Sequence, residues 1–162
     1  MFLLIMHPAG AKDLSLSHAK AEYTVTHIFK TVKGVSIDLK GKMVCENKKC
    51  EFLVAIGSKS FVSSDSNRDL NLQTILEVTK YPLIMVKGTL SEADLSKDQF
   101  DVPSKVSFHG IEKEYTLKIK RSEPFSGQLT LLLEDHNVER PSLLMAKIDN
   151  EVPVHFNFDW KE

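Results

Sequence analysis

Six histidines are the side chains of this chain best suited to metal binding or acid–base chemistry, and their spacing favours neither. No two of them have the i, i+2 or i, i+4 separation that places ligands on one face of a strand or helix. There is no nucleophile elbow of the G-x-S-x-G type, and the seven glycines are scattered singly, so no phosphate-binding loop is present. We therefore expect no metal, no cofactor and no catalytic residue. The histidines are His7, His18, His27, His109, His136 and His155.

Arg68 and Asp69 form a charged pair at the start of a short helical pattern. In a structural interpretation Asp69 caps the helix by accepting backbone N–H bonds, and Arg68 bridges to a carboxylate or carbonyl. In a functional interpretation Arg68 lies at a pocket mouth and holds an anionic head group by forked hydrogen bonds. The structural interpretation is favoured, and the functional one stays open. His27 and His109 are expected to close a polar network inside the fold.

Cys45 and Cys50 flank a polar loop between two alternating segments, which places them at the base of a predicted hairpin. Facing residues of antiparallel strands can have the separation that a disulfide requires. A single C-x4-C spacing is a poor zinc signal, because a structural zinc site needs four ligands. We expect a disulfide if the protein is exported and two reduced thiols otherwise.

Composition limits the classes of partner. The chain has 162 residues, which is typical of one domain, and a formal net charge of −1 from 21 basic and 22 acidic residues. No block of like charge offers the clustered basic face that nucleic acid requires. No apolar run approaches the roughly 20 residues needed to span a bilayer. We expect no nucleic-acid partner and no stable membrane insertion.

The N-terminus suggests export. Residues 1–6 are apolar, and Ala9 and Ala11 fit a small-residue cleavage site with Lys12 as the first mature residue. Residues 1–11 are expected to be a signal-peptide remnant left by a start codon placed too late, or else a disordered N-terminus. The domain is then residues 12–162, and the expected location is periplasmic or secreted.

Strand-type alternation of apolar and polar residues recurs through most of the chain. About eight half-buried strands joined by short turns predict an all-β antiparallel sandwich or barrel. One short helix is expected at about residues 69–79, ended by Pro82, and a helical turn near residues 141–146, started by Pro141. The alternating segments are residues 23–27, 35–39, 52–56, 84–86, 106–108, 115–119, 129–133 and 152–158.

Four separated blocks, in this order and spacing, resemble the YceI-like family of polyisoprenoid-binding proteins. They are Tyr23-Thr-Val-Thr-His27 with Val32-Lys-Gly34; residues 63–82, with Arg68-Asp69 before the helix and Tyr81-Pro82 after it; Val106-Ser-Phe-His-Gly-Ile-Glu-Lys113; and Val138-Glu-Arg-Pro-Ser-Leu-Leu144 followed by Asp149. Together the blocks cover nearly all of residues 15–160. No single block is diagnostic.

The resemblance implies a lipocalin-like, antiparallel eight-stranded β-barrel that is usually exported to the periplasm and holds a long isoprenoid lipid, polyprenyl or quinone-type, without bond chemistry. Departures at Leu76-Glu77-Val78 and at Met85 or Val86, where the family often has aromatic residues, leave the identity of the lipid open. The expected ligand-binding residues are Val25, His27, Ile37, Val54, Arg68, Leu72, Val86, Phe108, Leu117, Leu131 and Phe156.

Two other functions stay open. A filled barrel could serve as a stress-related or protein-interaction domain without a small ligand, with Phe29, Phe61 and Phe125 as core plugs. A metal-dependent enzyme is the weaker alternative. The oligomeric state is also open, with a homodimer as one option.

Overall fold

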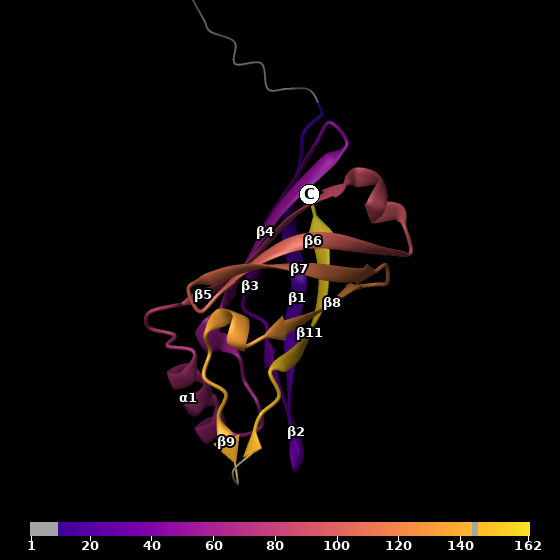
Figure 1. Cartoon of the computed structure of the whole chain (residues 1–162). Coiled ribbons are helices and arrows are strands. Elements are labelled where there is room, and N and C mark those ends of the chain that lie inside the picture. The colour runs from indigo at the N-terminus through magenta and orange to yellow at the C-terminus, as the bar shows by residue number, and fades with distance from the viewer. Residues whose placement is uncertain (1–9, 144–145) are drawn as a thin grey trace, which may run out of the picture.

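The computed structural model, described over residues 10–143 and 146–162, confirms the predicted barrel. Its main antiparallel sheet runs in the order β11-β8-β7-β6-β5-β4-β3-β1-β2, and an additional pairing of β11 with β1 closes it. Eight of these strands form the closed wall, and β2 extends one end of β1 (Figure 1). The elements are β1 (Lys12–His27), β2 (Lys30–Ser36), β3 (Leu39–Glu46), β4 (Lys49–Gly57), η1 (Ser58–Ser60), α1 (Ser66–Ile75), β5 (Leu83–Ser91), η2 (Glu92–Ser96), β6 (Gln99–Phe108), β7 (Ile111–Lys120), β8 (Phe125–Leu132), η3 (Glu134–His136), β9 (Ser142–Leu143), β10 (Ala146–Lys147) and β11 (Glu151–Lys161).

Strand β1 is the seam of the barrel because it pairs with three strands in turn. Residues 12–15 pair with β3, residues 15–23 with β11 and residues 21–27 with β2. The register with β11 shifts between Ser17 and Lys20, where His18 has a φ of 48°. Such a bulge bends a strand and increases its twist, which lets β1 follow the curved wall.

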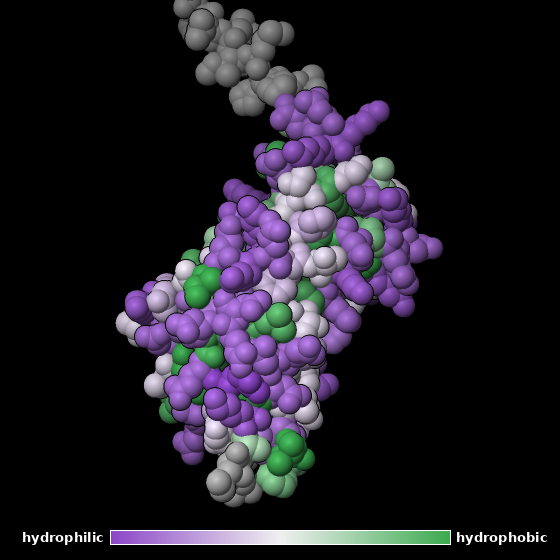
Figure 2. Space-filling model, viewed as in Figure 1, coloured by the Kyte–Doolittle hydropathy of each residue, from purple (hydrophilic) through white to green (hydrophobic). Residues whose placement is uncertain are grey.

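The two ends of the barrel differ. Helix α1 and strand β9 lie at one end, whereas the C-terminus and η2 lie at the opposite end (Figure 1). The outer face seen in Figure 2 is mainly hydrophilic, with apolar residues scattered over it. This is the result that the polar positions of the alternating strands predict. None of the described helices is long and apolar enough to cross a membrane.

The alternation predicts the inward face of most strands correctly, but the prediction for residues 35–39 is wrong. Gly34 and Ser36 are buried, whereas Ile37 follows the end of β2 and is 80% exposed. The side-chain period of a strand is two, and the inward positions of β2 are the small residues Gly34 and Ser36, so the apolar residues of this segment indicate the wrong face. Glycine is required at position 34 because a Cβ there would overlap the ring of Tyr23.

Helix α1 spans Ser66–Ile75, so the expected range of 69–79 begins and ends too late. The N-cap is Asp65, whose carboxylate accepts the backbone N–H of Arg68 at 3.0 Å, and not Asp69. At the other end Glu77 has a φ of 48°, which cannot continue a right-handed helix. The helical spacing of apolar residues continues beyond Ile75 in the sequence, but the chain there forms turns. Leu76 is buried within these turns.

The expected helical turn near residues 141–146 is also wrong where the structure describes it. Strands β9 and β10 form a short hairpin in which Leu143 pairs with Ala146. Arg140 Nε donates to the carbonyl of Ile148 at 2.9 Å, and Ile148 N donates to the carbonyl of Pro141 at 3.1 Å. These contacts across the hairpin hold its two sides as extended chain. Leu144 and Met145 lie outside the described residues.

Candidate functional site

The barrel encloses two apolar cavities along its length. We call the first the helix-end cavity; Leu72, Ile75 and Leu76 line it on the α1 side, together with Tyr23, Phe108, Leu131 and Pro141 among others. We call the second the aromatic cavity; its lining includes Phe52, Phe100, Phe125, Phe158 and Trp160. Among the residues that the structure describes, Glu139 is the only charged side chain that lines either cavity, and it lies in the helix-end cavity.

Both cavities are larger than packing defects. The space open to the centre of a water-sized sphere is about 120 Å³ in the helix-end cavity and about 70 Å³ in the aromatic cavity. Roughly 10–15 Å³ of such space is enough for one water molecule, but a cavity needs polar partners to hold that water. Both volumes are nevertheless below the roughly 300–1,000 Å³ of known ligand pockets. The arrangement suits an apolar, narrow ligand.

Most of the sequence-predicted ligand-binding residues lie on the lumen. Val25, Leu72, Phe108 and Leu131 line the helix-end cavity, Val54 and Leu117 line the aromatic cavity, and Val86 and Phe156 line both. Three predicted residues line neither: His27, Ile37 and Arg68. His27 is buried with Nε2 3.0 Å from the carbonyl oxygen of Ala146, and Ile37 points to solvent.

The three proposed core plugs behave differently from one another. Phe61 and Phe125 line the helix-end and aromatic cavities respectively, whereas Phe29 is 61% exposed in the β1–β2 turn, so its assignment to the core is wrong. Sequence reasoning missed Trp160, although it continues the alternation of Phe156 and Phe158 along β11. It also missed Leu95, which reaches the aromatic cavity from η2 outside any strand pattern.

A polar cluster lies beside the helix-end cavity, around Arg68 and Asp69. Asp69 accepts the backbone N–H of Ser63 at 2.9 and 3.0 Å and its hydroxyl at 2.6 Å, which holds the start of α1 on the preceding segment. Arg68 Nη1 is 3.4 Å from Ser63 Oγ, and its Nη2 is 3.8 Å from an Asp65 carboxylate oxygen. Arg68 keeps about a third of its side chain exposed.

Tyr23 connects this cluster to the cavity, because its ring is part of the lining. Burial raises the pKa of the Tyr23 hydroxyl, and the nearby negative charge of Asp69 raises it further, against the opposing effect of Arg68. The hydroxyl therefore stays protonated at neutral pH and is a neutral group at the wall of the cavity. The cluster offers the guanidinium of Arg68, the carboxylates of Asp65 and Asp69, and the phenol of Tyr23 near the α1 end.

Comparison with known proteins places the fold. A family model described as the YceI-like domain matches residues 13–160. The chain belongs to the YceI-like family. No curated protein matches it.

Solved structures agree with the YceI-like assignment at the level of fold. BcnA of Burkholderia cenocepacia has 14% identity and a TM-score of 0.74, over 86% of this chain and 94% of that one. A polyisoprenoid-binding domain from Saccharophagus degradans, implicated in plant cell wall breakdown, has 17% identity and a TM-score of 0.71, over 91% and 97%. The YceI protein of Campylobacter jejuni has 13% identity and a TM-score of 0.61, over 85% and 90%.

A histidine network supports the α1 end of this YceI-like barrel. His136 is fully buried; its Nδ1 lies 3.1 and 2.9 Å from the carbonyl oxygens of Phe108 and Ile111, and its Nε2 lies 2.8 Å from the Tyr115 hydroxyl. Burial lowers the pKa of His136. The neutral tautomer with a proton on Nδ1 satisfies all three contacts, with the tyrosine donating to Nε2.

His109 extends this network to the chain that follows α1. Its Nε2 lies 2.7 Å from a Glu77 carboxylate oxygen and its Nδ1 lies 3.0 Å from the backbone carbonyl oxygen of His136. Both ring nitrogens therefore lie within hydrogen-bond distance of an acceptor oxygen. His109 thus ties the β6–β7 turn to the segment after α1. Within residues 10–143 and 146–162, no group of three or more potential ligands could hold a metal ion.

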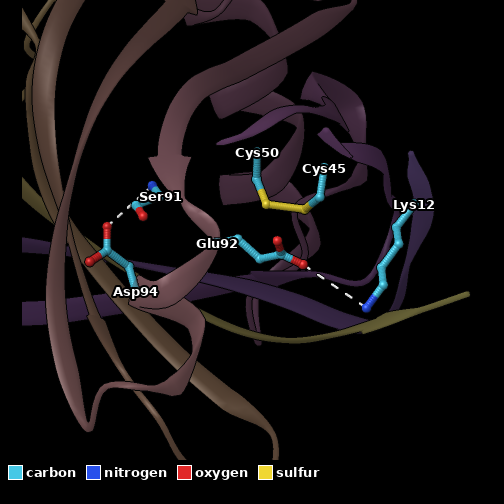
Figure 3. Close-up of a disulfide and its surroundings, with 6 residues drawn as sticks. All are labelled: Lys12, Cys45, Cys50, Ser91, Glu92 and Asp94. Atoms are coloured by element: carbon cyan, nitrogen blue, oxygen red, sulfur yellow. Dashed lines mark hydrogen bonds and ion pairs between the residues drawn. A yellow bond between two sulfur atoms is a disulfide. The ribbon is translucent and has the colours of Figure 1, made fainter. Parts of the chain in front are cut away.

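The opposite end of this YceI-like barrel contains the cysteines. Cys45 and Cys50 face each other across β3 and β4 and form a disulfide with an S–S distance of 2.01 Å (Figure 3). The two-residue turn Asn47-Lys48 places Glu46 opposite Lys49, and the cysteines are the next pair. Glu92, close to the disulfide in Figure 3, pairs with Lys12 of β1 at 4.0 Å.

Proposed function

We propose that this protein binds a long isoprenoid lipid, of polyprenyl or quinone type, in the lumen of its barrel, and that it carries, stores or senses the lipid in a stress response without chemical conversion. The observation that carries the proposal is the pair of apolar cavities that follow one another along the barrel. The likeness in fold to the polyisoprenoid-binding domain of Saccharophagus degradans supports the same class of ligand.

The energetics of such a lumen favour a linear hydrocarbon. Removing apolar surface from water stabilises a complex by about 25 cal/mol per Å², whereas association costs roughly 4–15 kcal/mol. Micromolar affinity needs about 8 kcal/mol net, which a few buried prenyl units supply. The lumen is surrounded by side chains from eight strands, and a branched, flexible prenyl chain can adapt to the uneven surface that they form.

The head group is proposed to lie at the α1 end. The lining of the aromatic cavity carries no charged side chain, whereas Arg68, Asp69 and the Tyr23 hydroxyl stand beside the helix-end cavity. Arg68 is partly exposed and has only long contacts to Ser63 and Asp65, so its guanidinium can turn to an anionic or carbonyl head group. The tail would then extend towards Trp160.

We also propose that the protein works in an oxidising compartment, periplasmic or secreted. The disulfide between Cys45 and Cys50 supports this location, because such bonds persist mainly outside the reducing cytosol. Intact mass measured under non-reducing conditions, on protein isolated from its own cell fraction, tests it. A pair of free thiols in that protein would contradict the location.

Native mass spectrometry and solvent extraction of protein purified from its own host test the lipid. We expect an isoprenoid to co-purify, and the delipidated protein to take up added polyprenol or ubiquinone. Leu117→Phe, which fills the aromatic cavity, should lower uptake while the protein stays folded by circular dichroism. Leu53→Phe is the matched control, because Leu53 is 44% exposed and lines neither cavity. Failure to recover or take up any lipid would support a filled barrel without a ligand.

A further inference from the structure

Val86 and Phe156 are the two residues that line both cavities, so they lie where the helix-end cavity meets the aromatic cavity. Val86 belongs to β5 and Phe156 to β11. In the closed wall three strands separate β5 from β11 in either direction: β8, β7 and β6 one way, β1, β3 and β4 the other. The two side chains therefore project from opposite walls into the lumen.

The residues next to them differ in size. Phe156 pairs with Ala21 on β1 and with Gly127 on β8, so it is the large side chain of its row. Val86 pairs with Val54 on β4 and with Val106 on β6, which makes a row of three valines on the opposite wall. An aromatic ring that faces a row of valines narrows the lumen at this level. Both rows consist of strand residues whose positions the barrel fixes.

We infer that Val86 and Phe156 form a constriction that sets the length of the prenyl chain bound by the protein, an inference that rests on the proposed lipid-binding function. A short chain occupies the helix-end cavity alone. A long chain has to pass between the valine row and the Phe156 ring before it reaches the aromatic cavity. Discrimination by length then comes from one pair of side chains and not from the total volume of the lumen.

The chain contains its own reporter of this passage. Trp160 is the single tryptophan of the sequence, and it lines the aromatic cavity but not the helix-end cavity. A ligand confined to the helix-end cavity leaves the surroundings of the indole unchanged. A ligand that passes the constriction contacts the aromatic cavity and shifts the tryptophan emission.

The experiment compares a short prenyl alcohol, farnesol, with a long one, solanesol, on the delipidated full chain. Affinities are measured by calorimetry in detergent-matched solutions, and tryptophan emission is recorded in parallel. In the wild type, farnesol should bind without changing the emission, whereas solanesol should change it. Phe156→Ala should raise the affinity ratio of solanesol to farnesol by about tenfold, and Val86→Phe should lower it by about tenfold.

Leu53→Ala is the control, because Leu53 lies next to Val54 on β4 but is 44% exposed and lines neither cavity. It should change the ratio by less than about threefold. Thermal melting verifies that each variant is folded, and Phe156→Leu, which should shift the ratio in the same direction, replaces Phe156→Ala if the alanine variant unfolds.

Three results would overturn the inference: an unchanged ratio in the folded Phe156 variant, an equal change in Leu53→Ala, or a wild-type emission shift caused by farnesol. In each of these cases the wild type still binds prenyl alcohol, so the proposed function stands. If the wild type binds neither alcohol, the proposed function fails and the inference fails with it.

Discussion

At the scale of single residues, His136 determines how one end of the barrel is held. Its ring accepts from Tyr115 and donates to two carbonyls of the β6–β7 turn region, while the Tyr115 oxygen also accepts the backbone N–H of Leu132 at 3.3 Å. One buried imidazole thus joins η3, β6, β7 and β8. A buried group with this many partners destabilises the fold when its protonation state changes.

The lowered pKa of His136 predicts a loss of stability in acid. The main cause is burial, assisted by the charge of Lys113. It is opposed by the hydrogen bonds that His136 donates to the carbonyls of Ile111 and Phe108, and by the charge of Asp135. The unfolded chain titrates near the ordinary value of 6.5 and binds the proton more readily. The stabilisation is therefore complete above that value and is lost as the pH falls from it towards the lower pKa of the folded state.

Urea unfolding from about pH 7.5 to about pH 5 checks this. The free energy of unfolding should fall more steeply in the wild type than in His136→Gln. The glutamine variant should itself be less stable at neutral pH by about 1–3 kcal/mol, because the amide cannot reproduce every hydrogen bond. Parallel pH curves for the two proteins would refute the role of His136.

Arg68 and Asp69 are adjacent but should respond oppositely to substitution. Asp69→Asn should lower the free energy of unfolding by about 1–3 kcal/mol, because it weakens the hydrogen bonds from Ser63. Arg68→Gln should cost less than about 1 kcal/mol, since its ion pair is long and exposed, and should weaken lipid binding. Chemical unfolding and lipid titration separate the two effects; an unfolded Arg68→Gln variant would make Arg68 a structural residue.

At the scale of elements, sequence periodicity predicted the inward face of most strands but not of β2. Leu129, Leu131 and Val152 are buried as expected. The failures lie where tertiary contacts decide. Ile37 follows a strand that ends early, and Leu76 is buried from a turn and not from a helix. The sequence around the end of β2 and the end of α1 contains no stop signal stronger than the apolar pattern, which continues past both ends.

The residues of the candidate site likewise include some that the sequence predicts and some that it does not. The lining by Val86, Phe108 and Phe156 could be predicted from alternation, because a barrel has one inner face. The lining by Leu95 could not, since it depends on how η2 folds back over the barrel end. The contacts of Arg68 likewise depend on where Ser63 and Asp65 lie.

The β3–β4 hairpin contains an unfavourable residue. Asn47 and Lys48 have φ values of 52° and 63°, the combination that two-residue hairpins of type I′ require. Asparagine tolerates this region, whereas lysine does so at a cost. Lys48→Gly should raise the free energy of unfolding by about 0.5–1 kcal/mol. Thermal or urea unfolding measures it, and Lys49→Gly, inside β4, should destabilise instead; a loss of stability in Lys48→Gly would contradict the turn assignment.

At the scale of the whole molecule, a barrel with unfilled space is less stable than a filled one of the same size, because the lining side chains lack contacts. A ligand bound in the lumen, as proposed above, would replace those contacts. Stability and occupancy should therefore rise together in this protein. The hydrophilic outer face takes no part in this relation (Figure 2).

Adding the ligand at about 100 times its dissociation constant should stabilise the delipidated protein by about 2.7 kcal/mol. For a chain of this length that corresponds to roughly 5–10 °C in the melting temperature. Differential scanning fluorimetry with added polyprenol measures the shift. Leu117→Phe should show little of it, and an equal shift in that variant would indicate binding outside the lumen.

The pairing of β1 with β11 also determines the stage of folding at which the barrel closes around its lumen. Ser15 pairs with Lys161, and Tyr23 pairs with Val154, so the first strand is closed by the last. Contacts this distant in sequence form slowly, because a long loop must be closed before they stabilise anything. A chain emerging from the ribosome has no sealed interior until its final strand is made. A ligand of the lumen would therefore be acquired by the folded barrel and not during synthesis.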